Sequence, residues 1–284
     1  NHPLAVAYIL TKLEQDPAPV AAGLLHDVIE DSKMTLEDLQ KKFGDEIAHL
    51  VDGVTKLGKL SFASREEHQA ESFRKMFLAM ARDIRVVIIK LADRLHNMQT
   101  LKYLTPKQQL DIAQETLDIY APLAHRMGIW GVKWELEDHS FSFLQTQDYQ
   151  RIREHVADNR KNREAYVNHV ITDLKAALAE AGIAADITGR PKHFYSIYQK
   201  MVSQNLSFDQ LYDVLAVRVI VESVRDCYSV LGIVHSHWKP IAGRFEDYIA
   251  MPKSNMYQSL HTAIIGMQGK PVEVQIRTRE MHKV

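Results

Sequence analysis

The segment from residue 26 to residue 31 places four side chains that can bind a metal directly after an apolar run. The run covers residues 20–25, and the polar side chains that follow it are His26, Asp27, Glu30 and Asp31. Burying imidazole and carboxylate groups against an apolar surface is costly unless a partner compensates for the lost water. A divalent metal ion is the simplest such partner, so we expect this part of the chain to fold around one.

Two more residues extend this candidate site. On a continuous helix, His26 and Asp27 would each share a face with the acidic residue four positions later, where a water could be activated. His2 and Asp93 lie in other predicted helices and complete a set of two imidazoles and two carboxylates. For His2 alone an ordinary core or surface role would be the better interpretation, and only the set favours a metal. Such a mixed nitrogen and oxygen site suits Mn, Fe, Co or Zn.

Composition narrows the class of protein. The 284 residues suffice for two ordinary domains. A formal net charge of −1 excludes a global basic field of the kind that binds nucleic acid in bulk. The single cysteine, Cys227, rules out a disulfide within the chain and a cysteine-rich zinc site, which is typical of a reducing, cytoplasmic setting. We find no apolar run of about 18 residues that would span a membrane, and we interpret the chain as a fragment of a longer polypeptide.

Residues 1–125 show the apolar spacing of successive helices, which predicts an all-α domain. Thr35 is expected to cap a helix together with Asp38, three residues further on, and Gly44 to end it. The elements expected next are a helix over 46–51, a loop over 51–58, an amphipathic helix over 64–81, and a buried helix over 84–101 that carries Asp93, Asn97 and Thr100 on one stripe.

The rest of the chain divides at Gly182. Residues 126–182 are interpreted as a helical linker, with a long solvated helix over 149–181 that Gly182 ends. Residues 183–284 predict an α+β domain with a mixed sheet. Its expected elements are strands over 211–221 and 272–277, a hairpin that joins 263–266 to the last strand, and helices over 195–202 and 227–238.

A second group of polar residues lies in this α+β part. Lys192, Ser196 and Lys200 form a row near a predicted helix N-terminus, which suits a triphosphate, although the spacing alone fits an ordinary basic surface equally well. Asp213 and Glu273 stand in otherwise apolar strands, where an isolated carboxylate is uncommon without a cation. Two strand carboxylates beside a basic helix favour Mg-assisted phosphoryl transfer.

Several motifs together resemble the catalytic half of the bifunctional Rel/SpoT stringent-response enzymes, over essentially the whole chain. They are HP at 2–3, HDVIED at 26–31, VDGVTK at 51–56, LADRLHNM at 91–98 and IYAPLAHR at 119–126. The resemblance implies an HD-type hydrolase domain over 1–125 that removes the 3′-pyrophosphate of (p)ppGpp to give GDP or GTP. It also implies roles for eight residues: His2, His26, Asp27 and Asp93 would hold Mn, Glu30 and Asp31 would orient or deprotonate the water, and Asn97 and Thr100 would line the nucleotide pocket.

The same resemblance implies a nucleotidyltransferase-like synthetase domain over 183–284, which transfers pyrophosphate from ATP to the 3′-OH of GDP or GTP. Asp213 would bind Mg, and Glu273 would complete the metal site or act as the base. The implied substrate contacts are Arg190, Lys192, Ser196 and Lys200 to phosphates, Arg218 to ATP, and Tyr257 stacked on guanine with Asn255 and His261 nearby. No membrane or nucleic-acid partner is implied for this fragment, because the family's ribosome-binding regions lie in C-terminal domains beyond it.

Two positions depart from the family pattern. Arg244, in the loop that distinguishes GDP from GTP, matches the bifunctional type, whereas Glu246 replaces a lysine with the opposite charge, so the acceptor is not assigned. Met256 stands where the family usually has glycine, and a φ above zero there would strain it. These departures favour a second hypothesis, a hydrolase whose second domain binds nucleotide but synthesises weakly or not at all. A non-catalytic (p)ppGpp sensor is the third.

Overall fold

The computed structural model describes residues 2–58, 74, 76, 78–158, 160–190, 193–205, 216–253, 256–266 and 269–283. The chain divides into two compact units, Asn1–His125 with Trp130–Leu144, and Arg126–Ile129 with Gln145–Val284. The predicted domain boundaries at 125 and 182 remain predictions, and the compact units follow other borders. Among the described residues, no helix combines the length and apolar character needed to cross a membrane.

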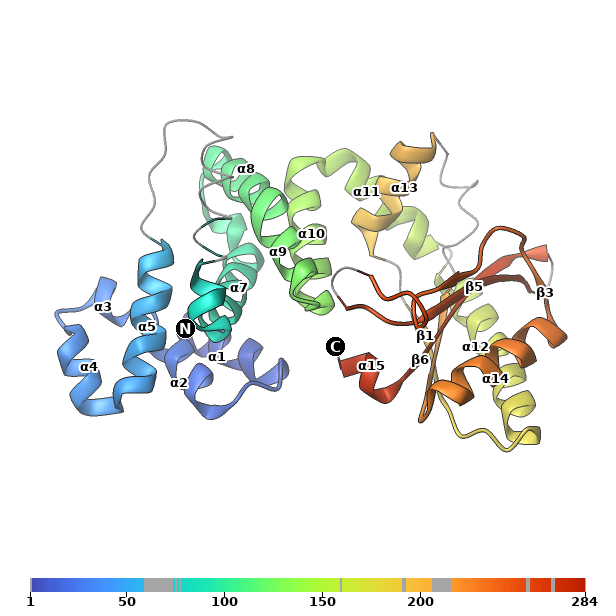
Figure 1. Cartoon of the computed structure of the whole chain (residues 1–284). Helices are drawn as coiled ribbons and strands as arrows, with labels where there is room; N and C mark the ends of the chain where they lie inside the picture. Colours follow the sequence, from blue (N-terminus) through green and yellow to red (C-terminus); the bar gives the residue numbers. More distant parts are fainter. Residues whose placement is uncertain are drawn as a thin grey trace. The chain divides into compact units, whose positions relative to one another are not determined.

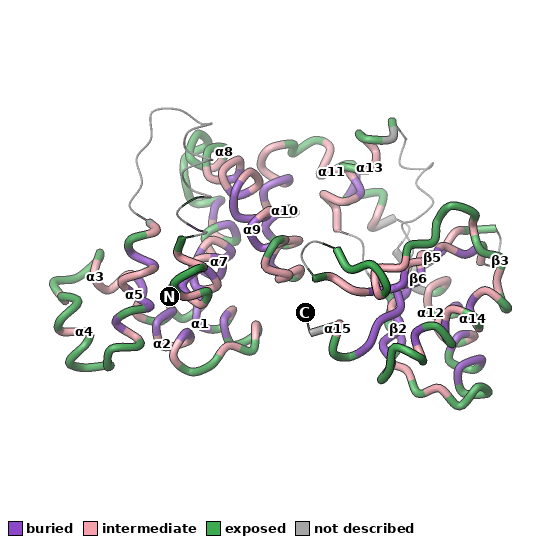
Figure 2. Tube along the Cα trace, in the orientation of Figure 1, coloured by how far each residue is buried: buried purple, intermediate pink, exposed green. Residues whose placement is uncertain are grey.

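Every described element of the first unit is helical, as predicted (Figure 1). The elements are α1 (His2–Lys12), α2 (Pro17–Leu25), α3 (Val28–Asp31), α4 (Leu36–Phe43), α5 (Asp45–Gly58), α7 (Ile84–Gln99), the 3-10 turn η1 (Leu101–Tyr103), α8 (Pro106–Glu115), the π-helical segment η2 (Thr116–Tyr120), α9 (Ala121–Arg126) and α10 (Trp130–Leu144). Helices α1, α2, α5 and α7 pack around a core that includes Val6, Leu10, Leu50 and Ile89 (Figure 2).

Local signals in the sequence set the ends of α4. The Thr35 hydroxyl accepts a hydrogen bond from the Asp38 backbone N–H at 3.2 Å, and the Asp38 carboxylate accepts one from the Thr35 N–H at 3.1 Å. Gly44 follows the helix with a φ of 88°, a conformation that glycine adopts without steric cost. The predicted capping box and helix end are therefore both confirmed.

The continuous helix on which His26 and Asp27 would share a face with Glu30 and Asp31 is not formed, and the buried helix expected over 21–29 is interrupted. Helix α2 ends at Leu25, and α3 begins only at Val28. Asp27 lies between them with φ −91° and ψ −6°, and its carbonyl accepts hydrogen bonds from the N–H groups of the next helical turn. This break turns the chain, so His26 and Asp27 lie at a helix junction rather than along the faces of one helix.

The predicted loop over 51–58 is also wrong, because these residues continue α5 to Gly58. Gly53, within this segment, allows close packing. A Cβ atom at Gly53 would lie 2.7 Å from a methyl group of Val86 on α7, closer than such atoms approach. Glycine thus lets α5 pack closely on α7, the helix that carries Asp93. The predicted buried helix over 84–101 is confirmed as α7, whereas most of the predicted helix over 64–81 lies outside the described residues.

The second unit is α+β, as predicted, with a mixed sheet. Its strand order is β1-β2-β6-β5-β3, with β4 paired to β5. Among the strand pairs of the described residues, β2–β6 is parallel and the others are antiparallel. The elements are α11 (Thr146–Asp158), α12 (Arg160–Glu180), β1 (Asp186–Arg190), α13 (Phe194–Gln204), β2 (Ala216–Val221), α14 (Val224–His237), β3 (Lys239–Pro240), β4 (Glu246–Asp247), β5 (Leu260–Ile265), β6 (Pro271–Thr278) and α15 (Arg279–Lys283).

The two faces of this sheet differ in character because strand side chains alternate. One face presents apolar residues such as Val217, Val274 and Ile264, which form a core with α12 and α14. Leu174 and Leu178 of α12 are buried in that core, so the prediction of a solvated linker helix is wrong for this segment. The charged residues on its outer side suggested a linker and concealed its apolar face.

Candidate functional site

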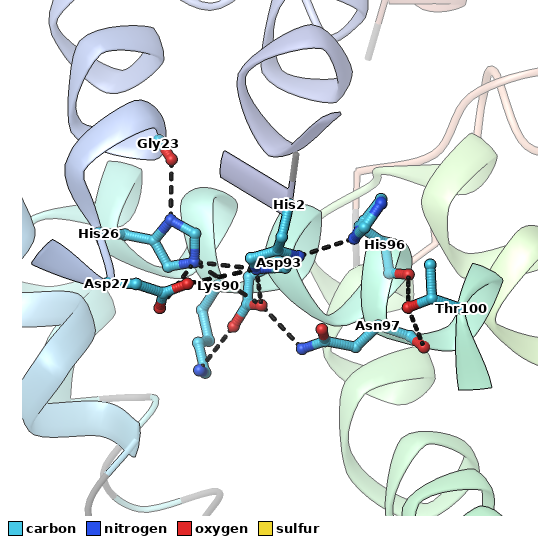
Figure 3. Close-up of polar contacts among 9 residues, drawn as sticks. All are labelled: His2, Gly23, His26, Asp27, Lys90, Asp93, His96, Asn97 and Thr100. Carbon is cyan, nitrogen blue, oxygen red and sulfur yellow. Dashed lines mark hydrogen bonds and ion pairs between the residues drawn. The ribbon is translucent and has the colours of Figure 1, made fainter. Parts of the chain in front are cut away.

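Four of the predicted metal ligands converge in the first unit, from three separate segments (Figure 3). His2 opens α1, His26 and Asp27 form the α2–α3 junction, and Asp93 lies in the middle of α7. The Nε2 atom of His2 is 3.2 Å from Oδ1 of Asp93 and 3.2 Å from Nε2 of His26. Asp27 reaches the same place, with Oδ1 3.1 Å from His26 Nε2 and Oδ2 3.6 Å from His2 Nε2. Ligand atoms of His2, His26 and Asp93 thus lie within 4.8 Å of one another, and Asp27 contacts both histidines.

His26 is held in the orientation that a metal ligand needs. Its side chain is buried, and its Nδ1 lies 2.8 Å from the carbonyl oxygen of Gly23. Because a carbonyl only accepts, Nδ1 must carry the proton and the neutral ring keeps its lone pair on Nε2. That lone pair faces the other three side chains. This is the usual arrangement for a metal-binding histidine, in which the second nitrogen donates to a fixed acceptor.

Asp93 is kept ionised although it is only 5% exposed. Burial by itself would raise the pKa of its carboxyl, but the hydrogen bond from His2 and the nearby Lys90 ammonium outweigh that effect and hold the pKa well below its usual range. Lys90 Nζ lies 2.7 Å from Oδ2, and the Asn97 amide donates to Oδ1 at 2.8 Å. The spacing of three and four residues along α7 places these partners on one face.

His2 has partners on both ring nitrogens. The hydrogen bond to Asp93 raises the pKa of the imidazole, and burial only partly opposes this. Its Nδ1 lies 2.7 Å from Nδ1 of His96, and the two rings are tilted by 54° with centroids 4.8 Å apart. Burial lowers the pKa of His96. His96 and Lys90 were not singled out as site residues from the sequence, although each stands three positions from Asp93, a spacing that would have identified them.

The other predicted hydrolase residues lie around this cluster. Glu30 and Asp31 are exposed on α3, directly after the junction. Asn97 is exposed on α7 and contacts the cluster through Asp93. The Thr100 hydroxyl donates to the backbone carbonyl of His96 at 3.0 Å, which closes the end of the same helix.

A second polar site lies on the sheet face opposite the apolar core. Along β6, Glu273, Gln275 and Arg277 alternate with buried valine and isoleucine. The register places Arg218 of β2 and His261 of β5 on either side of Gln275. Gln275 donates to the Glu273 carboxylate at 2.6 Å, and His261 Nδ1 is 3.7 Å from the same carboxylate oxygen. Strand alternation thus gathers a carboxylate, an amide, an imidazole and two guanidinium groups on one face.

Aromatic side chains border this face near residue 257. The Tyr257 hydroxyl and His261 Nε2 are 2.9 Å apart, and the Tyr248 ring packs edge-on against His261 with centroids 5.3 Å apart. The Arg277 guanidinium lies 5.8 Å from the Tyr257 ring centroid. Gln275 and Arg277, only 2% and 5% exposed, were not among the predicted site residues. The alternation that identified β6 as a strand already placed them on the same face as Glu273.

The remaining predicted synthetase residues are only partly accounted for. Ser196 and Lys200 lie one turn apart on α13, which packs against α11. Arg190 ends β1, and Arg244 is exposed between β3 and β4. Three predicted residues lie outside the described part of the chain: Lys192, Asp213 and Asn255.

Met256 adopts the conformation that the sequence marked as unfavourable. Its φ is 64°, in the left-handed region, and its side chain is 67% exposed. Its backbone N–H donates to the carbonyl of Lys253 at 2.8 Å, and the Lys253 N–H donates to the carbonyl of Tyr257 at 3.2 Å. A strained turn therefore directly precedes Tyr257.

Comparison with known proteins assigns each part of the chain to a family. A family profile described as HD domain matches residues 1–130, and one described as a region found in RelA / SpoT proteins matches residues 189–284. The chain is 54% identical to a probable guanosine-3′,5′-bis(diphosphate) 3′-pyrophosphohydrolase of Synechocystis, 55% to a GTP pyrophosphokinase of Streptomyces coelicolor, and 51% to the bifunctional (p)ppGpp synthase/hydrolase SpoT of Escherichia coli. All three alignments cover 100% of this chain, but only 37%, 33% and 40% of the respective relatives.

The helical unit with its buried imidazole and carboxylate cluster is thus an HD domain, which implies a divalent metal. Joined to the RelA/SpoT region, it places the chain in the Rel/SpoT family. The chain spans about a third to two fifths of the length of these relatives.

Proposed function

We propose that the helical unit removes the 3′-pyrophosphate of (p)ppGpp, giving GDP or GTP, with Mn held by His2, His26, Asp27 and Asp93. The observation that carries this proposal is the convergence of these four side chains from three segments onto one volume. The donor set fits the ion, since Mn accepts both imidazole nitrogen and carboxylate oxygen. When bound, such an ion supplies positive charge that polarises a phosphate oxygen and makes a water more acidic.

The protein's own groups prepare this chemistry. His26 presents an unprotonated Nε2 because Gly23 fixes its other nitrogen. Asp93 presents a carboxylate that is already ionised, because the hydrogen bond from His2 and the charge of Lys90 outweigh its burial. Glu30 and Asp31, on the exposed turn beside Asp27, are proposed to orient or deprotonate the attacking water. Asn97 and Thr100 are proposed to line the nucleotide pocket.

The test is a pair of aspartate variants in the Mn-loaded protein. Asp27→Ala is expected to abolish Mn-dependent release of pyrophosphate from ppGpp, because it removes one ligand of the cluster. Asp111→Ala removes an exposed carboxylate from α8 of the same unit and serves as the matched control, with activity unchanged. Turnover by Asp27→Ala at the wild-type rate would refute the metal assignment.

We propose further that the sheet unit transfers pyrophosphate from ATP to the 3′-OH of GDP or GTP, assisted by Mg. The 3′ oxygen forms the new bond to the β-phosphorus, AMP leaves, and a base takes the hydroxyl proton. Glu273 is proposed to complete the Mg site with Asp213 or to act as that base. Its carboxylate lies among Gln275 and His261 on the polar sheet face, which supports the proposal.

The remaining contacts are proposed from the resemblance to the Rel/SpoT family. Ser196 and Lys200 on α13, with Arg190 and Lys192 before them, are assigned to phosphates, and Arg218 to ATP. Tyr257 is assigned to guanine stacking, with Asn255 and His261 beside it and Arg244 in the acceptor loop. An assay with radiolabelled ATP, GDP or GTP, and Mg tests the set: Glu273→Gln should lose synthesis and retain ppGpp hydrolysis. Loss of both activities together would contradict two separate sites.

A weaker synthetase is the second candidate function, and the left-handed backbone of Met256 favours it. In that case the helical unit hydrolyses (p)ppGpp while the sheet unit binds nucleotide with little or no transfer. The same assay distinguishes the two candidate functions. If the unmodified chain forms no product and Met256→Gly does, strain at this turn limits synthesis.

A further inference from the structure

The two histidines of the proposed metal centre need the same placement of their ring proton, and each has a different neighbour at Nδ1. Each must present an unprotonated Nε2 to bind a metal, so each must carry its proton on Nδ1. For His26 the acceptor of that proton is the Gly23 carbonyl, which is part of the backbone of α2. For His2 the neighbour of Nδ1 is a side chain, His96 of α7 (Figure 3).

A metal held by the proposed ligand set would fix the direction of this hydrogen bond of His2. Its Nε2 faces Asp93 Oδ1 at 3.2 Å, His26 Nε2 at 3.2 Å and Asp27 Oδ2 at 3.6 Å, which are the other proposed ligand atoms. A metal bound at this place would take up the lone pair of Nε2, so the proton of the neutral ring would reside on Nδ1. His2 would then donate and His96 would accept. Since a neutral imidazole carries one proton, His96 must hold its own on Nε2.

We propose that His96 is a positioning residue that holds His2 in the tautomer and orientation required for metal binding, by accepting a hydrogen bond from His2 Nδ1. This inference rests on the metal site of the proposed function and assigns a role to a residue outside the ligand set. His96 stands three residues after Asp93, so one rigid helix carries both a ligand and the group that orients another ligand. The 2.7 Å contact joins α7 to the first turn of α1.

Replacement by an acceptor of known position distinguishes this role from ordinary packing of two rings. An asparagine amide at position 96 occupies the place of the imidazole Nδ1, whereas a glutamine amide reaches the place of Nε2. If His96 acts through Nδ1, His96→Asn retains the function and His96→Gln loses it, although glutamine is the larger of the two. A residue that only fills space would show the opposite order.

The first measurement is Mn binding to the metal-free protein by titration calorimetry. His96→Ala and His96→Gln are expected to raise the Kd for Mn by about 10- to 100-fold, the usual effect of removing an outer partner of a ligand. His96→Asn should remain within about threefold of wild type on the same scale. His49→Ala, which removes an exposed histidine from α5 of the same unit, is the control and should leave Kd unchanged. A Kd unchanged in His96→Ala would overturn the proposal.

The second measurement reads the placement of His2 directly, from crystal structures of the metal-free wild type, His96→Asn and His96→Ala. The first two should place the His2 ring with Nδ1 toward residue 96 and Nε2 toward Asp93, and His96→Ala should leave the ring turned or poorly ordered. A His2 ring that keeps its position in His96→Ala would overturn the inference. If wild type binds no Mn, the metal assignment fails, and this second measurement still decides the role of His96.

Discussion

The two candidate sites are built on different structural principles. The metal centre in the helical unit draws His2, the His26–Asp27 pair and Asp93 from segments far apart in the sequence, and its atoms meet within a few ångströms. The polar sheet face draws Glu273 and its neighbours from adjacent strands, where register alone sets their spacing. A site assembled by helix packing depends on the tightness of that packing, whereas a site laid out on a sheet depends on alternation. Changes at each should therefore affect the other little.

The largest expected effect is at Asp93, where the carboxylate compensates a buried ammonium. Asp93→Ala leaves Lys90 without its partner, and breaking a buried ion pair in this way costs about 3–5 kcal/mol of unfolding free energy. Denaturant unfolding of the helical unit measures the loss. Adding Lys90→Met to this variant should restore part of it. If the losses of unfolding free energy from the two substitutions simply add in the double variant, the two charges do not interact.

The addition of Mn is expected to have the next largest effect on stability, and this effect should differ between the two units. A ligand that binds only the folded state at 100 times its Kd adds about 2.7 kcal/mol of stability. We expect Mn to raise the melting temperature of the helical unit and to leave the transition of the sheet unit in place, as followed by calorimetry. In Asp27→Ala the shift should vanish. Equal shifts of both transitions would contradict an Mn site that belongs to the helical unit alone.

A change in the packing between α5 and α7 is expected to have a smaller effect on stability. Gly53→Ala places a Cβ atom 2.7 Å from a methyl group of Val86, so α5 must move away from α7 at a cost of about 1–3 kcal/mol. Val86→Ala in the same chain should relieve the clash. Gly131→Ala in α10 is the matched control, because a Cβ there meets no atom within 4 Å. That substitution should leave stability equal or slightly higher, since alanine is the better helix former.

The smallest expected effect is at Met256, in the sheet unit. Glycine adopts a φ of 64° without the steric penalty that methionine meets, so Met256→Gly should raise the stability of this unit by up to about 1 kcal/mol. Met256→Ala retains the Cβ atom and should bring no gain. Thermal unfolding checks both variants. Equal stability of the glycine and alanine variants would show that the turn stores no strain.

Local patterns predicted much of the fold. The capping box at Thr35, the helix end at Gly44, the buried helix around Asp93 and the hairpin of β5 and β6 all follow from short-range spacing, and all are confirmed. Two of the wrong predictions concern residues whose role depends on distant neighbours. The segment around Gly53 was predicted as a loop, but it is helical and packs against Val86 of α7. The charges of α12 suggested a solvated linker, but Leu174 and Leu178 pack in the sheet core.

The sequence by itself determined which groups are present: two imidazoles and two carboxylates in the helical half, and a carboxylate in an alternating strand of the other. Tertiary structure decided which atoms meet. The break at Asp27 places His26 and Asp27 at a helix junction, and the packing of α1 on α7 brings His2 beside His96. Strand register places Arg218 next to Gln275. The physical reason is that spacing along a chain fixes the face on which a side chain lies, whereas its partner is fixed by how whole elements pack.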